Sequence, residues 1–184
     1  NHWISSFDDD LIEGIHYSVL LYGGALLAHL SASDEAVSDF IKLHDINRHM
    51  AIIMDSDKSD TDTELKPHVQ RIIDELQDRS GLVWVTSGRE VENYLAGDKL
   101  QNALKTIHSR IYESSCKTGK YDHAFYFMRK RENGRRETYK QGDKVAVAKL
   151  LCVEPLDLDI LDLRERLAEL TALIRDANGF ELKQ

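Results

Sequence analysis

Apolar and polar positions alternate along this chain in a way that predicts strands and helices in turn. Continuous apolar runs bounded by turn residues predict three buried strands, over 16–24, 49–57 and 82–86. Apolar residues three or four apart predict helices, over 2–12, from 33 or 34 to 44, and over 67–78, 99–114, 142–151 and 157–178. The segment 87–95 leads from the last strand into another helix. Asn133-Gly134 favours a hairpin turn within 121–140. The alternation indicates an α/β fold with a parallel sheet flanked by helices.

Two acidic residues, Asp55 and Asp57, stand where the apolar run of the 49–57 strand ends. In a parallel α/β sheet, ligands bind beyond the carboxyl ends of the strands. Residues two apart in a strand point to the same side, so this pair could bind one Mg²⁺ or bracket two. The alternative is an acidic turn that does no more than end the strand.

The segment TSGREVENYL (86–95) follows the next predicted strand and should bring further acids to the same sheet edge. Its candidates are Glu90 and Glu92, and Gly88 allows a sharp turn before them. Arg89 could pair with a phosphate or with one of the acids. The alternative is that the two glutamates only favour a helix N-terminus through its dipole, and this alternative is stronger for Glu92 than for Glu90.

Charge is distributed unevenly along the chain. The 184 residues have a formal net charge of −8, yet residues 117–149 hold ten Lys and Arg against four Asp and Glu. The acidic average argues against a protein that coats DNA, whereas a basic hairpin could follow a nucleic-acid backbone. The candidate DNA-binding residues are Arg89, Arg129, Lys130, Arg131, Arg135, Arg136 and Lys140. The alternative is a hairpin whose charges are merely solvated.

One further cation, Lys144, follows Gly142-Asp143 at the predicted start of a helix. A lysine in that position could stabilise the charge on a transferring phosphoryl group. It is therefore a candidate catalytic residue, whereas the hairpin cations are candidates for binding.

Other functional classes lack their signals. No apolar stretch approaches the roughly 20 residues that a membrane span requires, and neither a signal peptide nor a phosphate-binding glycine loop is recognisable. Cys116 and Cys152 lie far apart in no metal-like spacing, as expected of thiols in a reducing cytoplasm. The apolar stripe of the 157–178 helix could pack on its own sheet or on another subunit, and packing within the chain is the simpler expectation.

Three segments together resemble a known family: IIMDSDK (52–58), VTSGREVENYL (85–95) and GDKVAVAKLL (142–151). The combination is similar to the C-terminal Toprim nuclease domain of the OLD (overcoming lysogenization defect) family of ATP-dependent endonucleases. These proteins join an N-terminal ABC-type ATPase domain to a Toprim domain, and relatives act in defence against phage. The resemblance covers residues 1–155 and leaves 156–184 as a C-terminal helical extension.

The resemblance implies a Toprim-type, Rossmann-like parallel sheet flanked by helices, with a basic hairpin insertion and a C-terminal helix. It implies two-metal hydrolysis of DNA phosphodiesters with Mg²⁺ or Mn²⁺. The metal ligands would be Asp55, Asp57, Glu90 and Glu92, and the catalytic set Asp55, Glu90 and Lys144. Ser56, between the ligands, could contribute its backbone or hydroxyl. ATP would act only through a domain outside this chain, and a homo-oligomer is expected.

One departure from the family pattern concerns its first acid. Toprim domains carry a glutamate just after their first strand, in an E-G-x-x-D setting, whereas Glu13-Gly14 precedes a predicted strand here. We therefore expect the first strand and its acids upstream of Asn1, within a longer protein, and weak metal binding and cutting by this fragment alone. Two alternatives stay open: a degenerate Toprim domain for interaction or regulation, and a primase or topoisomerase module. A topoisomerase needs a catalytic tyrosine, for which Tyr94 and Tyr139 are available.

Overall fold

The structure, a computed structural model, describes residues 1–21, 47, 49–76, 81–131 and 133–180. It is mixed α/β, with a two-stranded parallel sheet, a separate three-stranded antiparallel sheet and helices. The described residues form two compact units. The first unit draws on 1–54, 64–85 and 164–184, and the second on 55–63 and 86–163.

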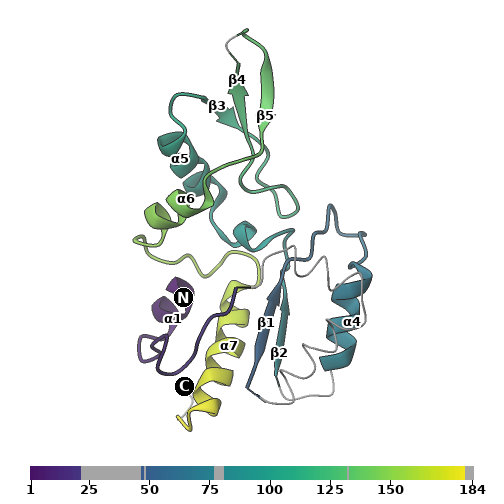
Figure 1. Ribbon diagram of the computed structural model, residues 1–184, viewed down its shortest axis with the longest axis vertical. Helices are drawn as coiled ribbons and strands as arrows, with labels where there is room; N and C mark the ends of the chain where they lie inside the picture. Colours follow the sequence, from purple (N-terminus) through teal and green to yellow (C-terminus); the bar gives the residue numbers. More distant parts are fainter. Residues whose placement is uncertain (22–46, 48, 77–80, 132, 181–184) are drawn as a thin grey trace. The chain divides into compact units, whose positions relative to one another are not determined.

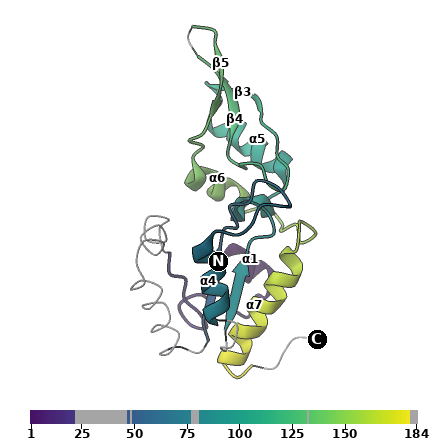
Figure 2. The same cartoon turned by 90° about the vertical axis from the view of Figure 1, so that its right-hand side faces the viewer.

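The first unit is built around two parallel strands, β1 (Ala51–Met54) and β2 (Leu82–Val85). Helix α4 (Pro67–Leu76) packs an apolar face, formed by Val69, Ile72 and Leu76, against buried residues of β1. Figures 1 and 2 show α4 and helix α7 (Leu163–Ala177) on opposite sides of the strand pair. The coverage is uneven along β1, since Ile52 and Met54 are buried whereas Ile53, on the other face, is 47% exposed.

The N-terminal segment belongs to this unit through two contacts with distant residues. Trp3 of helix α1 (His2–Phe7) stacks on Trp84 of β2, with ring centroids 6.3 Å apart. The guanidinium of Arg175 in α7 donates to Asp8 at 2.5 and 2.9 Å and to Asp10 at 2.8 Å. Asp8 and Arg175 are both buried, and the charge of each compensates the other where water is excluded.

The second unit packs helices on an antiparallel sheet of order β3-β4-β5. Its strands are β3 (Tyr112–Ser115), β4 (Phe127–Lys130) and β5 (Arg136–Tyr139). Its helices are the short 3₁₀ turn η1 (Val91–Tyr94), α5 (Gly97–Ile107) and α6 (Lys144–Leu151). The core joins α5 to the sheet and α6 through buried residues, Leu100, Ala103, Leu104, Ala124, Phe125, Phe127 and Val147.

Several predicted elements are confirmed because their signals are local. The strands expected over 49–57 and 82–86 form and pair in parallel, although both are shorter than predicted. The hairpin turns at Gly134, whose φ of 79° suits glycine. Helix α6 is capped by Asp143, whose carboxylate accepts from the Ala146 N–H at 2.9 Å. Helix α7 ends before Gly179, with a φ of 68°.

Other predicted elements are wrong. Residues 16–21 form no strand, only an isolated bridge between Glu13 and Tyr17, while 22–24 and the expected helix from 33 or 34 to 44 lie outside the described residues. The helix expected over 99–114 ends at Ile107, and residues 112–115 pair with β4 instead. The segment 87–95, expected to lead into a helix, holds the 3₁₀ turn η1 and is followed by α5 at Gly97.

The sheet expectation is confirmed only in its coarser form. A parallel β1–β2 pair is present, but the other described strands make a separate antiparallel sheet. The C-terminal helix begins at Leu163 instead of residue 157, because Leu161 adopts a left-handed φ of 54° that interrupts a helix. In the described part of the chain, no helix is long and apolar enough to cross a membrane.

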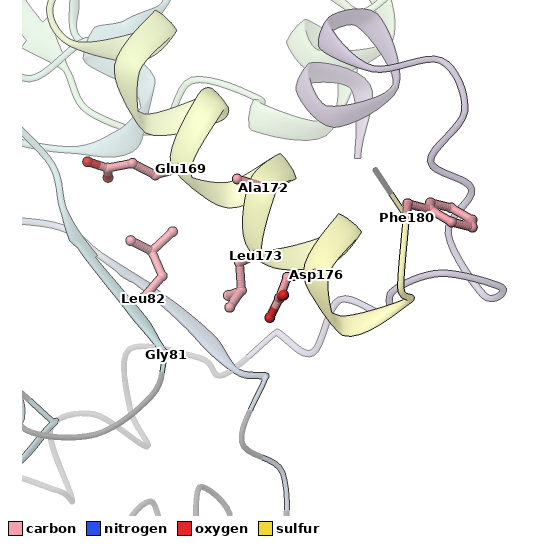
Figure 3. A pocket seen from close by; sticks show the side chains of 7 residues that line it. All are labelled: Gly81, Leu82, Glu169, Ala172, Leu173, Asp176 and Phe180. Atoms are coloured by element: carbon pink, nitrogen blue, oxygen red, sulfur yellow. The ribbon is translucent and has the colours of Figure 1, made fainter. Parts of the chain in front are cut away.

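A pocket of about 460 Å³ lies within the first unit, between the start of β2 and α7. Figure 3 shows Leu82 and Leu173 beside it, with Phe180 at its edge. None of the residues predicted to act in catalysis or binding lines this pocket.

Candidate active site

Two loops of the second unit carry the predicted acids, and buried hydroxyls join them. One loop begins at Asp55, directly after β1, and the other at Thr86, directly after β2. The Thr86 hydroxyl accepts from the Ser56 N–H at 2.9 Å and donates to the Gly88 carbonyl at 2.9 Å. The Ser56 hydroxyl donates to the same carbonyl at 2.5 Å. Because Ser56 and Thr86 are almost completely buried, these bonds set the spacing of the loops without competition from water.

Gly88 is required by this close approach. A Cβ at this position would lie 2.7 Å from the Asn93 Cβ and 2.8 Å from the Lys120 carbonyl oxygen. Since contacts under 3.0 Å force a shift of the neighbours, no larger residue fits without moving the second loop. Gly88 therefore allows the chain to pack closely against Asn93 and Lys120, in addition to the turn expected from the sequence.

Asp55 and Asp57 are oriented differently from two residues of a regular strand. The Asp55 carboxylate accepts from the Val91 N–H at 2.8 Å and so reaches the second loop. The Asp57 N–H donates to the Arg89 carbonyl at 2.9 Å, and its φ of 55° is left-handed. β1 ends at Met54, so the prediction that the two acids share a strand face does not apply, because Asp57 has left the extended conformation.

Glu90 is the N-cap of η1. Its N–H donates to the Asn93 side chain at 2.8 Å, and the reciprocal bond of a capping box is also present. One carboxylate oxygen accepts from the Ala124 N–H at 2.7 Å, and the other lies 3.6 Å from Nδ1 of His123. Both glutamates therefore lie at the start of η1, Glu90 as its N-cap and Glu92 in its first turn.

Glu92 pairs with Lys144 across 52 residues of sequence. The Lys144 Nζ lies 2.5 Å from Oε1 of Glu92, whose side chain is only 15% exposed. Oε2 of Glu92 is buried and has no hydrogen-bond partner among the described residues. A buried carboxylate oxygen without a donor is unfavourable unless a ligand satisfies it. Glu92 therefore keeps one carboxylate oxygen for a ligand, whereas a carboxylate oxygen of Glu90 already accepts from the backbone N–H of Ala124.

The electrostatics of the site couple these groups. Partial burial raises the pKa of the Asp55 carboxyl; the Val91 N–H opposes this, and nearby Glu92, Asp57 and Glu90 raise the pKa further. Partial burial acts to lower the pKa of Lys144, but Glu92, Glu90 and Asp55 outweigh it and the pKa is raised. The acids of both loops and Lys144 are therefore within electrostatic range of one another.

The acids do not close into a compact metal cage. Among the described residues, the group whose ligand atoms all lie within 4.8 Å of one another is Asp8, Asp9 and Asp10, in the first unit. That group contains the two acids that hold Arg175. Asp55, Asp57, Glu90 and Glu92 are near one another but more widely spaced, as expected of like charges that repel.

Comparison with known proteins adds no assignment to this geometry. No protein-family model matches the chain, and neither curated proteins nor solved structures gave a match. The functional argument therefore depends on the site itself.

The hairpin cations divide into two groups. Arg129 and Arg131 both bind Glu137, whose pKa falls to about 2 through hydrogen bonds from Arg131 and Arg129. Arg136 binds Glu113 of β3 at 2.8 Å. The others, Lys130, Arg135 and Lys140, are exposed. Among the described residues of the hairpin, only the cations of this second group form no ion pair with a strand carboxylate.

Arg89 does not pair with a described carboxylate. Its guanidinium donates to the Lys58 carbonyl at 3.2 Å, and its buried Nε has no hydrogen-bond partner among the described residues. It braces the first loop, a role that neither of the sequence expectations included.

Sequence reasoning missed three residues of the site. Thr86 was passed over because a threonine after a strand is common, and His123 because its sequence neighbours carry no motif. Tyr94 was considered only as a nucleophile, but it is 1% exposed, accepts from the Ser87 N–H at 2.9 Å and donates to Asp162 at 2.7 Å. No local pattern signals these roles, because each partner is distant or backbone.

Proposed function

We propose that this chain is the nuclease part of a metal-dependent DNA endonuclease, with a Toprim-type sheet of which β1 and β2 are members. The observation that carries the proposal is the convergence of Asp55, Glu92 and Lys144 from three separate segments. Acids at the carboxyl ends of two parallel neighbours are where this class of fold binds ligands. The ATPase of the family, and a role in defence against phage, belong to the same proposal.

The donor set fits a hard divalent cation. Carboxylate oxygens are the ligands that Mg²⁺ and Mn²⁺ prefer, and Glu92 holds one buried oxygen without a hydrogen-bond partner among the described residues. Burial and the neighbouring carboxylates raise the pKa of Asp55. A bound cation would offset the repulsion between these negative charges. When bound, the metal would activate water and stabilise the leaving oxygen.

The roles of this chain's own residues follow from their contacts. Asp55 and Glu92 would be the principal ligands, while Asp57 and Glu90 contribute negative charge at the margins, since Glu90 is held by the Ala124 N–H. Lys144 now neutralises Glu92. With substrate present, it would turn toward the phosphate and balance the charge that develops there.

A second candidate is a regulatory Toprim-like domain that does not cut. It is favoured by the closed Lys144–Glu92 pair and by the wide spacing of the acids. Tyr94 is disfavoured as the catalytic tyrosine of a topoisomerase, because its buried hydroxyl accepts from the Ser87 N–H and donates to Asp162. Tyr139 packs against Phe127 and His108, in an aromatic cluster of the antiparallel sheet.

Plasmid nicking by the full-length protein that carries this chain tests the proposal. We expect nicking with Mg²⁺ or Mn²⁺ and none with EDTA, and a loss of about a hundredfold or more in Asp55→Asn and in Lys144→Met. Asp62→Asn, in the same loop, and Lys149→Met, in the same helix, are matched controls that should cut normally. Activity that survives both site substitutions would remove the mechanism.

Binding and stability readouts accompany the assay. Calorimetry should show Mn²⁺ binding that Asp55→Asn abolishes, even where cutting by the chain is slow. Asp55→Asn should not lower the denaturation midpoint at neutral pH. The raised pKa of Asp55 means that its charge opposes folding above that pKa, and the opposition disappears as the pH falls through it. A large loss of stability without metal would indicate a structural acid instead.

A further inference from the structure

The turn at residues 123–126 is held rigidly beside the site. The Ala124 N–H donates to the Glu90 carboxylate at 2.7 Å. The side chain of Gln101, itself buried, donates to the carbonyls of Ala124 at 3.3 Å and Tyr126 at 3.1 Å. Ala124 and Phe125 are buried in the core of the second unit. The backbone of the turn is therefore fixed from both sides.

This fixed turn presents two rings that the core does not use. His123 and Tyr126 stack on each other, with centroids 4.2 Å apart and an interplanar angle of 22°. Both residues are only half-buried, whereas the two residues between them are buried. The ammonium of Lys140 lies 5.5 Å from the centre of the Tyr126 ring. Proteins that bind single-stranded nucleic acid combine aromatic side chains, on which bases stack, with cations that follow the backbone, and this turn brings both kinds of group together.

The turn that carries the stack contacts the proposed site at two residues, His123 and Phe125. Nδ1 of His123 lies 3.6 Å from the Glu90 carboxylate. The Lys144 ammonium lies 5.4 Å from the centre of the Phe125 ring, in the same turn. A nucleotide on the stack would therefore have its phosphate close to the acids and to Lys144.

We infer that the His123–Tyr126 stack is a binding site for one unpaired nucleobase next to the scissile phosphate. The inference rests on the proposed nuclease function and specifies its substrate: DNA with an unstacked base at the site. In a duplex, both faces of a base are covered by its neighbours in the stack. An aromatic side chain can therefore reach a base face only where the strand is single, frayed or distorted.

Binding without catalytic metal tests this inference. A short DNA carrying one fluorescent purine analogue is titrated with the complete chain in EDTA, both single-stranded and as a duplex. We expect at least about tenfold tighter binding of the single strand, with quenching of the analogue by stacking. Tyr126→Leu should weaken single-strand binding about tenfold, the order that one base–aromatic stack contributes, and abolish the quenching. Tyr126→Phe, which keeps the ring, should restore most of both.

The outcomes separate the two proposals. Equal binding of single strand and duplex would overturn the inferred nucleobase-binding site. A Tyr126→Leu variant that quenches the analogue and binds DNA like the original chain would overturn it as well. The comparison of the two DNA forms needs no variant, so it decides the matter even if Tyr126→Leu fails to fold. Tyr126-dependent binding without any metal-dependent cutting would instead support the nucleobase-binding site and overturn the nuclease function.

Discussion

At the scale of single residues, the site depends on hydroxyls more than on the acids that draw attention first. The Thr86 side chain is an acceptor for one loop and a donor to the other, at 2.9 Å each. Both bonds are buried, so the loss of this one oxygen leaves the Ser56 N–H without its acceptor and the Gly88 carbonyl with only the bond from the Ser56 hydroxyl. Asp55 and Glu92 are held at their spacing by a residue that contacts neither a metal nor a substrate.

The first prediction concerns that hydroxyl. Thr86→Val keeps the shape but removes both bonds, and we expect it to lower the free energy of unfolding by about 1–3 kcal/mol. Thr86→Ser, which retains the hydroxyl, is the matched control and should lose less. Equilibrium urea denaturation of the two variants makes the comparison. Equal stability of Thr86→Val and the original chain would show that water replaces the lost bonds.

At the scale of elements, the antiparallel sheet combines strand pairing with charge pairing. Glu137 of β5 receives two arginines, and its depressed pKa means that the carboxylate favours folding above its ordinary pKa of 4.5. This contribution is lost as the pH falls toward about 2, where Glu137 takes up a proton. Arg129 also lies over the Tyr139 ring, 4.7 Å from its centre. It therefore acts mainly within the sheet.

The hairpin cations should consequently differ in DNA binding. Arg135→Ala should weaken binding and reduce the slope of log affinity against log salt by about 1, the change expected for one lost phosphate contact. Lys130→Ala should act in the same way. Arg129→Ala should leave that slope nearly unchanged and lower the denaturation midpoint instead. Fluorescence anisotropy across a salt series measures the slopes, and identical slopes for all three variants would contradict the division.

At the scale of the whole molecule, the first unit is closed by a contact between residues 167 apart in sequence. Arg175 and Asp8 are both buried and joined by two hydrogen bonds, and Arg175 also binds Asp10. The paired carboxylates raise the pKa of Arg175 and keep it charged. Because each charge is withdrawn from water, neither is tolerated without the other.

A double-mutant cycle should reveal this dependence. Arg175→Met and Asp8→Asn should each lower the denaturation midpoint, since each leaves a buried polar partner behind. The double variant should lose less than the sum of the single losses. Thermal and urea denaturation of the four proteins give the coupling. Strict additivity would mean that the two side chains contribute independently.

Local patterns were sufficient for part of this structure. The apolar runs became β1 and β2, Asn133-Gly134 became the hairpin turn, and Asp143 became the cap of α6. Each signal operates within a few residues, where backbone preference and side-chain spacing decide the outcome. The acids of the candidate site were also found this way, because they follow directly on those strands.

Tertiary structure decided the remainder. Residues 112–115 extend a helical pattern in the sequence yet form β3, because β4 offers a partner. Glu90 and Glu92 look alike in sequence, but only contacts with Ala124 and Lys144, 34 and 52 residues away, give one to the backbone and the other to a cation. Such contacts have no local period, since their energy exists only after the chain has folded.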